Sequence, residues 1–132
     1  MNTYHLSVVT PDGVEFEGEV ESLLLRTTDG DVEILAGHMD YLAAVGTGRA
    51  RIITGGVSKN AACSGGFLTV SHGEVRLVPV TFEFAEDIDL DRAKRAKEKA
   101  EVALADAKDD KSLTLAKARL QRAISRIGVK EL

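Results

Sequence analysis

Short runs in which polar and apolar residues alternate fill the first 84 residues, and turns containing glycine separate them. Alternation with period two in segments rich in Val, Ile, Leu, Thr and Phe is typical of β-strands. The turns are Pro11-Asp12-Gly13, Asp29-Gly30, Gly55-Gly56, Gly65-Gly66 and His72-Gly73, where glycine permits positive φ. The predicted strands are residues 4–10, 14–18, 20–28, 31–36, 41–45, 48–54, 57–64, 67–71 and 74–84. Short strands at this spacing favour an antiparallel β-sandwich.

The pattern changes after Phe84 to the period of an α-helix. Ala, Lys, Glu, Asp, Leu and Arg dominate, with no proline and no glycine before Gly128. The acids that follow Phe84 predict a first helix that starts near Asp87 or Asp89, because acids cap helix N-termini. Two apolar stripes recur at steps of three and four. They are Ala93, Ala96, Ala100, Ala103, Leu104 and Ala107, then Leu113, Ala116, Leu120, Ala123, Ile124 and Ile127.

Between the stripes, residues 108–112 are polar and offer Asp110 or Ser112 as the cap of a second helix. We therefore expect an α+β chain in two parts, a β-sandwich over residues 1–84 and an antiparallel two-helix hairpin over residues 85–132. Alanine methyl groups bury little area, so the hairpin should pack weakly and open at modest cost.

Charge divides the chain at the same place. Residues 1–84 carry five Lys/Arg and eleven Asp/Glu, a net charge of −6, whereas the second part has a net charge of +2. Residues 111–132 alone contain six basic residues and one acid. The acidic first part and the lack of aromatic residues after Phe84 argue against nucleic-acid binding, so an acidic protein partner suits the basic helix better.

The composition, 44% hydrophobic and 29% charged residues, is typical of a folded protein. Uncharged runs are much shorter than the roughly 20 apolar residues of a membrane span, and the N-terminus does not resemble a signal peptide. We therefore expect membrane contact only through partners.

Catalytic and metal-binding patterns are weak. Cys63-Ser64-Gly65-Gly66-Phe67 lacks the spacing of a nucleophile turn, and a hairpin turn between strands explains it. The three histidines and the single cysteine have no metal-ligand spacing, and no phosphate-binding glycine loop is present. We expect no catalytic residue, no metal site and no requirement for Mg²⁺.

One basic constellation remains. Asp89 and Arg92 share a face of the first helix, and Arg119, Arg122 and Arg126 follow at steps of three and four on the second. Folding of the hairpin would bring them together. Arginine matches phosphate oxygens, so the constellation suits a nucleoside phosphate; a solvated helix face with ion pairs is the alternative interpretation.

Several segments together resemble the epsilon subunit of F-type ATP synthase, over nearly the whole chain. They are Thr10-Pro11-Asp12-Gly13, Asp29-Gly30 with Ile34-Leu35-Ala36-Gly37-His38, Ser64-Gly65-Gly66-Phe67, and Ile88-Asp89-Leu90-Asp91-Arg92-Ala93. Ala36 replaces the proline usual before Gly-His.

The resemblance implies regulatory binding of ATP. The segment from Ile88 to Ala93 resembles the Ile/Leu-Asp-x-x-Arg-Ala pattern by which some bacterial members bind ATP. Lys99 stands where related binding members can carry arginine, which keeps the charge and loses the bidentate fork. The implied ATP-binding residues are Glu83, Ile88, Asp89, Arg92, Ala93, Lys99, Arg122 and Arg126.

The resemblance also implies partners and a location. The sandwich would seat on the gamma subunit of the central stalk and on the rotor c-ring, and the basic residues would meet an acidic segment of the catalytic beta subunits. The implied partner-binding residues are His38, Arg119, Arg122 and Arg126. The chain would lie peripherally on the cytoplasmic face of the cell membrane.

The implied function is a non-catalytic regulatory and coupling subunit of a proton-translocating synthase. ATP would stabilise the folded hairpin, and the extended hairpin would inhibit ATP hydrolysis. The alternatives are a constitutive structural rotor subunit without nucleotide-dependent switching and, more remotely, a small hydrolase.

Overall fold

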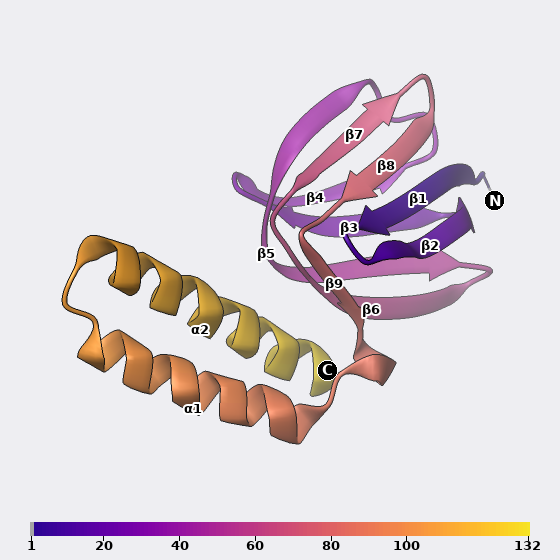
Figure 1. Ribbon diagram of the computed structural model, residues 1–132. Helices are drawn as coiled ribbons and strands as arrows, with labels where there is room; N and C mark the ends of the chain where they lie inside the picture. The colour runs from indigo at the N-terminus through magenta and orange to yellow at the C-terminus, as the bar shows by residue number, and fades with distance from the viewer. Residues whose placement is uncertain (1) are drawn as a thin grey trace.

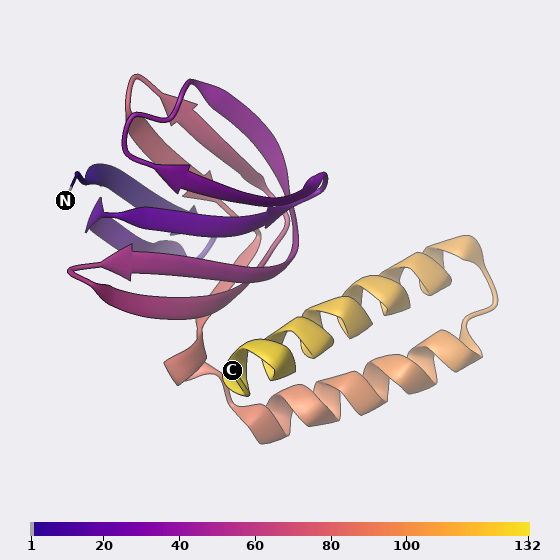
Figure 2. The same ribbon diagram turned by 180° about the vertical axis from the view of Figure 1, so that it is seen from behind.

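The computed structural model describes residues 2–132 and contains a β-sandwich followed by two antiparallel helices. Both ribbon views show the hairpin below the sandwich, with its tip pointing away from it and the C-terminal end of the second helix close to it (Figures 1 and 2). The predicted α+β fold is confirmed. No helix among residues 2–132 has the length and apolar character needed to cross a membrane.

Two sheets share one long strand. One sheet has the order β2-β1-β8-β7-β5 and the other β4-β3-β5-β6-β9; every pairing is antiparallel except that of β1 with β8. The strands within residues 2–132 are β1 (Tyr4–Thr10), β2 (Gly13–Val20), β3 (Ser22–Thr27), β4 (Gly30–Leu35), β5 (Tyr41–Thr54), β6 (Val57–Ser64), β7 (Phe67–Ser71), β8 (Glu74–Val78) and β9 (Thr81–Phe84).

Strand β5 corrects the prediction of two separate strands at 41–45 and 48–54. It pairs with β7 through residues 41–44 and with β6 through residues 48–54, so it passes from one sheet to the other. The glycines that suggested a break make room at this corner: a Cβ on Gly48 would lie 2.9 Å from the Cβ of Arg26. Glycine therefore permits a bend in a continuous strand.

Two further boundaries differ from the prediction. The expected strand 74–84 is divided into β8 and β9 at Pro79, which has no N–H to continue the ladder. Gly65-Gly66 is not a hairpin turn, because β6 pairs with β5 and β9 while β7 pairs with β5 and β8. It carries the chain between the sheets so tightly that a Cβ on Gly66 would lie 1.9 Å from the carbonyl oxygen of Val78.

The core follows the predicted alternation. In β1, Tyr4, Leu6, Val8 and Thr10 are buried and the residues between them are half-buried. The same alternation buries Val75 and Leu77 in β8. Burial of such apolar area is the main favourable contribution to folding of the sandwich.

The hairpin consists of α1 (Leu90–Asp106) and α2 (Asp110–Lys130), after a short 3₁₀ turn η1 (Ala85–Asp87). Asp89 caps α1, accepting a hydrogen bond from the Arg92 backbone N–H at 3.1 Å, which agrees with one of the two predicted starts. The cap of α2 is Asp109 rather than Asp110 or Ser112. Its carboxylate accepts from the Ser112 N–H at 2.7 Å, and that bond lowers the pKa of Asp109.

Small residues fill the hairpin interface, where Ala93, Ala100, Ala116 and Ala123 are buried. Ile124, predicted to share this stripe, is instead 49% exposed. The hairpin meets the sandwich through α2, which contacts β5, β6 and η1. A small cluster of Ala62, Ile88 and Val129 lies at this junction.

Candidate functional site

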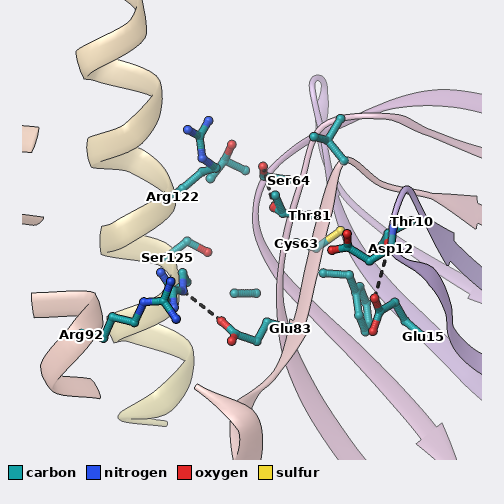
Figure 3. A pocket seen from close by; sticks show the side chains of 15 residues that line it. Thr10, Asp12, Glu15, Cys63, Ser64, Thr81, Glu83, Arg92, Arg122 and Ser125 are labelled. Carbon is teal, nitrogen blue, oxygen red and sulfur yellow. Dashed lines mark hydrogen bonds and ion pairs between the residues drawn. The ribbon is translucent and has the colours of Figure 1, made fainter. Parts of the chain in front are cut away.

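A cleft of about 420 Å³ lies between the helical hairpin and the sandwich (Figure 3). Arg92 comes from α1, and Arg122, Ser125 and Arg126 come from α2. This volume lies within the range of about 300–1,000 Å³ of ligand pockets. The sandwich supplies Thr10, Asp12, Glu15, Thr47, Ala62, Cys63, Ser64, Val80, Thr81, Phe82 and Glu83.

One ion pair spans the cleft. The Arg126 Nε donates to Glu83 Oε1 at 2.9 Å, joining α2 to β9 (dashed in Figure 3). Both side chains are partly exposed, so water screens the pair and it contributes about 1 kcal/mol or less. A second contact, from Lys130 Nζ to the Ala85 carbonyl at 3.0 Å, holds the end of α2. Polar contact between the two parts is therefore modest.

The other two arginines of the cleft have no acidic partner. Within the described range 2–132, no carboxylate lies within 4.0 Å of the guanidinium nitrogens of Arg92 or Arg122. Guanidinium groups offer paired donors that match phosphate oxygens. The hairpin wall of the cleft is thus suited to a phosphate-bearing anion.

The β1–β2 turn forms the opposite wall and is acidic. Thr10 Oγ1 donates to Glu15 Oε1 at 3.0 Å and accepts from the Asp12 N–H at 3.1 Å, which orders the turn. Asp12 and Glu15 take no part in the ion pairs formed among residues 2–132. A ligand with phosphates at one end and hydrogen-bond donors at the other would complement both walls.

Cys63 is a buried residue of the cleft and carries no nucleophile chemistry. Its burial raises the pKa of the thiol to about 12, so the sulfur is protonated at neutral pH. A neutral thiol is a poor nucleophile. Nearby, Thr81 Oγ1 donates to Ser64 Oγ at 3.0 Å.

Four of the eight residues expected to bind ATP line the cleft: Glu83, Arg92, Arg122 and Arg126. The other four are placed around it. Ile88 is buried in the junction cluster, Asp89 caps α1 and Ala93 is buried in the hairpin interface. Lys99 is exposed on α1 and is not among the residues that line the cleft.

The remaining partner candidates lie elsewhere. His38 follows β4, with its Nδ1 2.8 Å from the Met39 carbonyl oxygen and its ring edge-on to Tyr41 at 5.5 Å. Met39 and Leu42 beside it are 77% and 71% exposed, an apolar surface. Arg119 is exposed and lines a groove at the hairpin tip, away from Arg122 and Arg126.

Sequence reasoning missed Ser125 and the residues of the acidic wall. Ser125 Oγ is enclosed and has no hydrogen-bond partner among the described residues, which marks it as a group that a ligand could satisfy. The sequence could have indicated Ser125 as a site residue, because helical spacing places it on the same face of α2 as Arg122 and Arg126. No comparable local signal marks Asp12 or Glu15, which reach the cleft only through the packing of the sandwich.

We found no metal centre in the part of the chain that the structure covers: no three His, Cys, Asp or Glu side chains within residues 2–132 are grouped so as to hold an ion. Arg92, Arg122 and Arg126 give the cleft hydrogen-bond donors that suit an anion.

Comparison with protein families matches both parts of the chain. Residues 3–85 match the beta-sandwich domain of the ATP synthase delta/epsilon chain, and residues 86–131 match its long alpha-helix domain. The chain is 38% identical over 129 residues to the ATP synthase epsilon chain of Bacillus velezensis, covering 98% of each chain. It is 39% identical over 129 residues to that of Shouchella clausii, covering 98% of this chain and 96% of the relative.

Solved structures share the fold. A chain in the Euglena gracilis mitochondrial ATP synthase (OSCP/F1/c-ring) aligns with a TM-score of 0.81 at 23% identity, covering 93% of this chain and 78% of that one. A chain in the central stalk/c-ring structure of the Tetrahymena thermophila mitochondrial ATP synthase aligns with a TM-score of 0.68 at 14% identity, covering 96% and 95%. Both family matches and the curated relatives agree, so the chain belongs to the ATP synthase delta/epsilon family as a bacterial-type epsilon subunit, a non-catalytic subunit of the ATP synthase.

Proposed function

We propose that this subunit couples and regulates a proton-translocating ATP synthase through two states of its hairpin. In the folded state, ATP occupies the cleft and ties α1, α2 and β9 together. In the extended state, the basic α2 reaches an acidic segment of the catalytic beta subunits and inhibits ATP hydrolysis. The observation that carries this proposal is the meeting of Arg92, Arg122 and Arg126 with Glu83 in one cleft.

The position of the cleft couples ligand binding to folding of the hairpin. Arg92 lies on α1, Arg126 on α2 and Glu83 on β9, so these groups surround one ligand only while the hairpin is folded. A ligand that binds one state shifts the equilibrium by its difference in affinity for the two states. ATP should therefore favour the folded hairpin, and loss of ATP should release it.

The weak junction makes such an equilibrium accessible. The hairpin interface is lined with alanine, and the junction cluster contains Ala62, Ile88 and Val129. These side chains bury little apolar area, and each Å² of buried apolar area stabilises the folded state by only roughly 25 cal/mol. Few polar contacts add to them, so opening should cost only a small part of the stability of the sandwich.

The proposed partners of the sandwich are the gamma subunit and the c-ring. Two features support this: the related chains belong to structures described as F1/c-ring and central stalk/c-ring, and the sandwich exposes Met39 and Leu42 beside His38. Exposed apolar side chains gathered in one place are typical of protein interfaces. On this proposal the chain lies at the cytoplasmic face of the membrane and reaches the membrane only through these partners.

Titration of the purified chain with ATP, read by amide hydrogen exchange, tests the switch. We expect ATP to slow exchange over residues 90–130 and to leave the sandwich unchanged. GTP and inorganic phosphate serve as ligand controls that separate recognition of the base from recognition of the phosphates. Unchanged exchange of the hairpin at saturating ATP, in a chain whose sandwich is folded, would instead favour the constitutive rotor subunit.

A further inference from the structure

Ser125 brings to the cleft a polar group that the folded chain does not use. It lines the α2 wall of the cleft next to Arg122 (Figure 3) and directly precedes Arg126 in the chain. Its Oγ is buried and has no hydrogen-bond partner among residues 2–132. Burial of a hydroxyl without a partner is unfavourable, because the hydroxyl loses the water to which it bonds in the unfolded chain.

Three other hydroxyl groups of the cleft already have partners. Thr81 Oγ1 donates to Ser64 Oγ at 3.0 Å, and Thr10 Oγ1 donates to Glu15 Oε1 at 3.0 Å. A serine inside a helix can also donate to the backbone carbonyl one turn earlier, but Ser125 Oγ makes no such bond. The hydroxyl of Ser125 is therefore available to a ligand in a way that the other three are not.

The helix itself gains nothing from a serine at this position. Serine is less favourable than alanine in a helix interior, because its hydroxyl competes for backbone hydrogen bonds. Alanine occupies other buried positions of α2, at Ala116 and Ala123. A group outside the helix therefore explains the hydroxyl at position 125 better than the helix does.

The Ser125 hydroxyl is enclosed by docking of α2 on the sandwich. Val129 lies one turn further along the same face of α2 and packs with Ala62 of β6. When the hairpin leaves the sandwich, this face of α2 meets water, and water satisfies the hydroxyl. Without a ligand, Ser125 therefore favours the open hairpin.

A phosphate group in the cleft would reverse this preference. Arg122 and Arg126 lie on the same face of α2 as Ser125 and line the same cleft, so a phosphate that they bind lies close to this serine. A hydrogen bond from a hydroxyl to a charged phosphate oxygen is stronger than one to a neutral acceptor. Rotation about the single torsion χ1 redirects the hydroxyl of a serine that already lines the cleft.

We propose that Ser125 donates a hydrogen bond to a phosphate oxygen of the bound nucleotide and thereby couples occupancy of the cleft to folding of the hairpin. This inference rests on the proposed function and adds a ligand-binding residue to it. Without ligand, the buried hydroxyl disfavours the folded hairpin; with ligand, the same hydroxyl favours it. Ser125 thus widens the difference between the two states of the switch.

The variant Ser125→Ala tests this inference through two effects of opposite sign on amide exchange in α2. Without ATP, exchange should be about tenfold slower than in the wild-type chain, because the unpaired hydroxyl is gone. A fixed excess of ATP should then add about tenfold less slowing than it adds in the wild-type chain, because one bond to a charged group is lost. The added slowing reports affinity for the folded state, so the two effects are measured separately.

Two further variants separate the hydroxyl from other effects of the substitution. Thr114→Ala changes an exposed residue of α2 to alanine, and its higher helix propensity should slow exchange without ATP by only about threefold. The slowing that ATP adds should be that of the wild-type chain in Thr114→Ala. Ser125→Thr keeps the hydroxyl and should also retain this added slowing. A purely structural role of Ser125 would alter exchange without ATP and leave the added slowing unchanged.

The outcomes distinguish this inference from the proposed function. If ATP slows exchange equally in Ser125→Ala and in the wild-type chain, the role of Ser125 is wrong and the proposed function stands. Exchange without ATP that is no slower in Ser125→Ala than in Thr114→Ala would also overturn the role of Ser125. If ATP leaves the wild-type hairpin unchanged, the proposed function fails and this inference fails with it.

Discussion

At the scale of single residues, the arginines of the cleft differ in whether a carboxylate of the folded chain is already paired with them. Arg126 is engaged by Glu83, whereas Arg92 and Arg122 have no carboxylate partner within residues 2–132. A phosphate that enters must share or displace Glu83 at Arg126, and it meets the other two without competition. All three offer donors to such a phosphate, so the proposal of ATP binding predicts a measurable loss of affinity when any one is removed.

Arg126→Ala should weaken ATP binding by about tenfold or more. A hydrogen bond to a charged group contributes about 1.5–3 kcal/mol, and 1.4 kcal/mol corresponds to tenfold. Calorimetric titration of the purified chain measures this directly. Arg95→Ala on the same hairpin, outside the cleft, is the matched control and should bind normally.

The same titration decides the role of Lys99. Because Lys99 is exposed and does not line the cleft, Lys99→Ala should change ATP affinity less than twofold. A loss for Lys99→Ala as large as that for Arg126→Ala would show that the bound state differs from this structure. Equal affinity of Arg126→Ala and the wild-type chain would remove Arg126 from the site.

Because Cys63 is buried, we expect the protein to lose stability at alkaline pH. Burial raises the pKa of the Cys63 thiol in the folded chain from 9.0 to about 12, so the thiol ionises at lower pH in the unfolded chain than in the folded one. The contribution of the neutral thiol to the free energy of unfolding is therefore complete below about pH 9, and it falls by about 1.4 kcal/mol per pH unit as pH rises towards 12. Urea unfolding midpoints measured from about pH 8 to about pH 11 should fall less steeply for Cys63→Ala than for the wild-type chain. The raised pKa of buried Tyr4 leaves a residual slope in that variant, and parallel slopes would contradict the prediction.

At the scale of elements, the attachment of α2 to the sandwich depends on few side chains. Val129 is 4% exposed and packs with Ala62 and Ile88. The rest of the contact is polar and partly exposed. The junction should therefore respond to a small loss of apolar volume.

Val129→Ala should loosen the hairpin while the sandwich stays intact. Removing two carbon atoms from a buried site costs about 1–2 kcal/mol, at about 0.8 kcal/mol per methylene. Hydrogen exchange should accelerate about tenfold in α2 and remain unchanged in β1 and β8. Val102→Ala is the control, because Val102 is 62% exposed on α1. If α2 exchanges at the wild-type rate in Val129→Ala, the hairpin is held by contacts other than this cluster.

At the scale of the whole molecule, the two roles proposed for α2 share Arg122 and Arg126 but differ at Arg119. Arg122 and Arg126 line the cleft, whereas Arg119 lies at the hairpin tip and does not. The basic character of α2 in the proposed inhibited state therefore includes a residue that ATP binding does not use. This separation allows inhibition to be tested without disturbing the ligand site.

Arg119→Ala should relieve inhibition of ATP hydrolysis in the assembled enzyme and leave ATP affinity of the isolated chain unchanged. The physical reason is the loss of one charge facing an acidic partner. Hydrolysis rates of enzyme reconstituted with each variant provide the measurement, and Lys94→Ala on α1 is the control. Unaltered inhibition would refute a role for Arg119 in inhibition. A fall in ATP affinity would show that Arg119 also affects nucleotide binding.

Much of the fold was predictable because it follows from local patterns. Alternation along β1 and β8 indicated strands, and the acids before Leu90 indicated the start of α1. Three errors had one origin, namely that a local signal has several tertiary meanings. Glycines at 46 and 48 allow a bend beneath Arg26, and Gly65-Gly66 crosses between sheets. Ile124 lies half exposed in a groove that α2 forms with β3 and β5, although its spacing also fits the hairpin stripe.

The candidate site divides in the same way. Arg92, Arg122 and Arg126 were predictable from spacing on two helices and from resemblance to a family, since helical period decides which residues share a face. The acidic wall and Ser125 were not, because Asp12 and Glu15 reach the cleft only when the sandwich is assembled and α2 lies against it. By itself, the sequence determined the strands, the helices and which arginines share a helix face, since these depend on residues a few positions apart. The tertiary structure alone decided which charges are paired, which hydroxyl has no partner and which helix face is uncovered, because those depend on contacts between segments far apart in the chain.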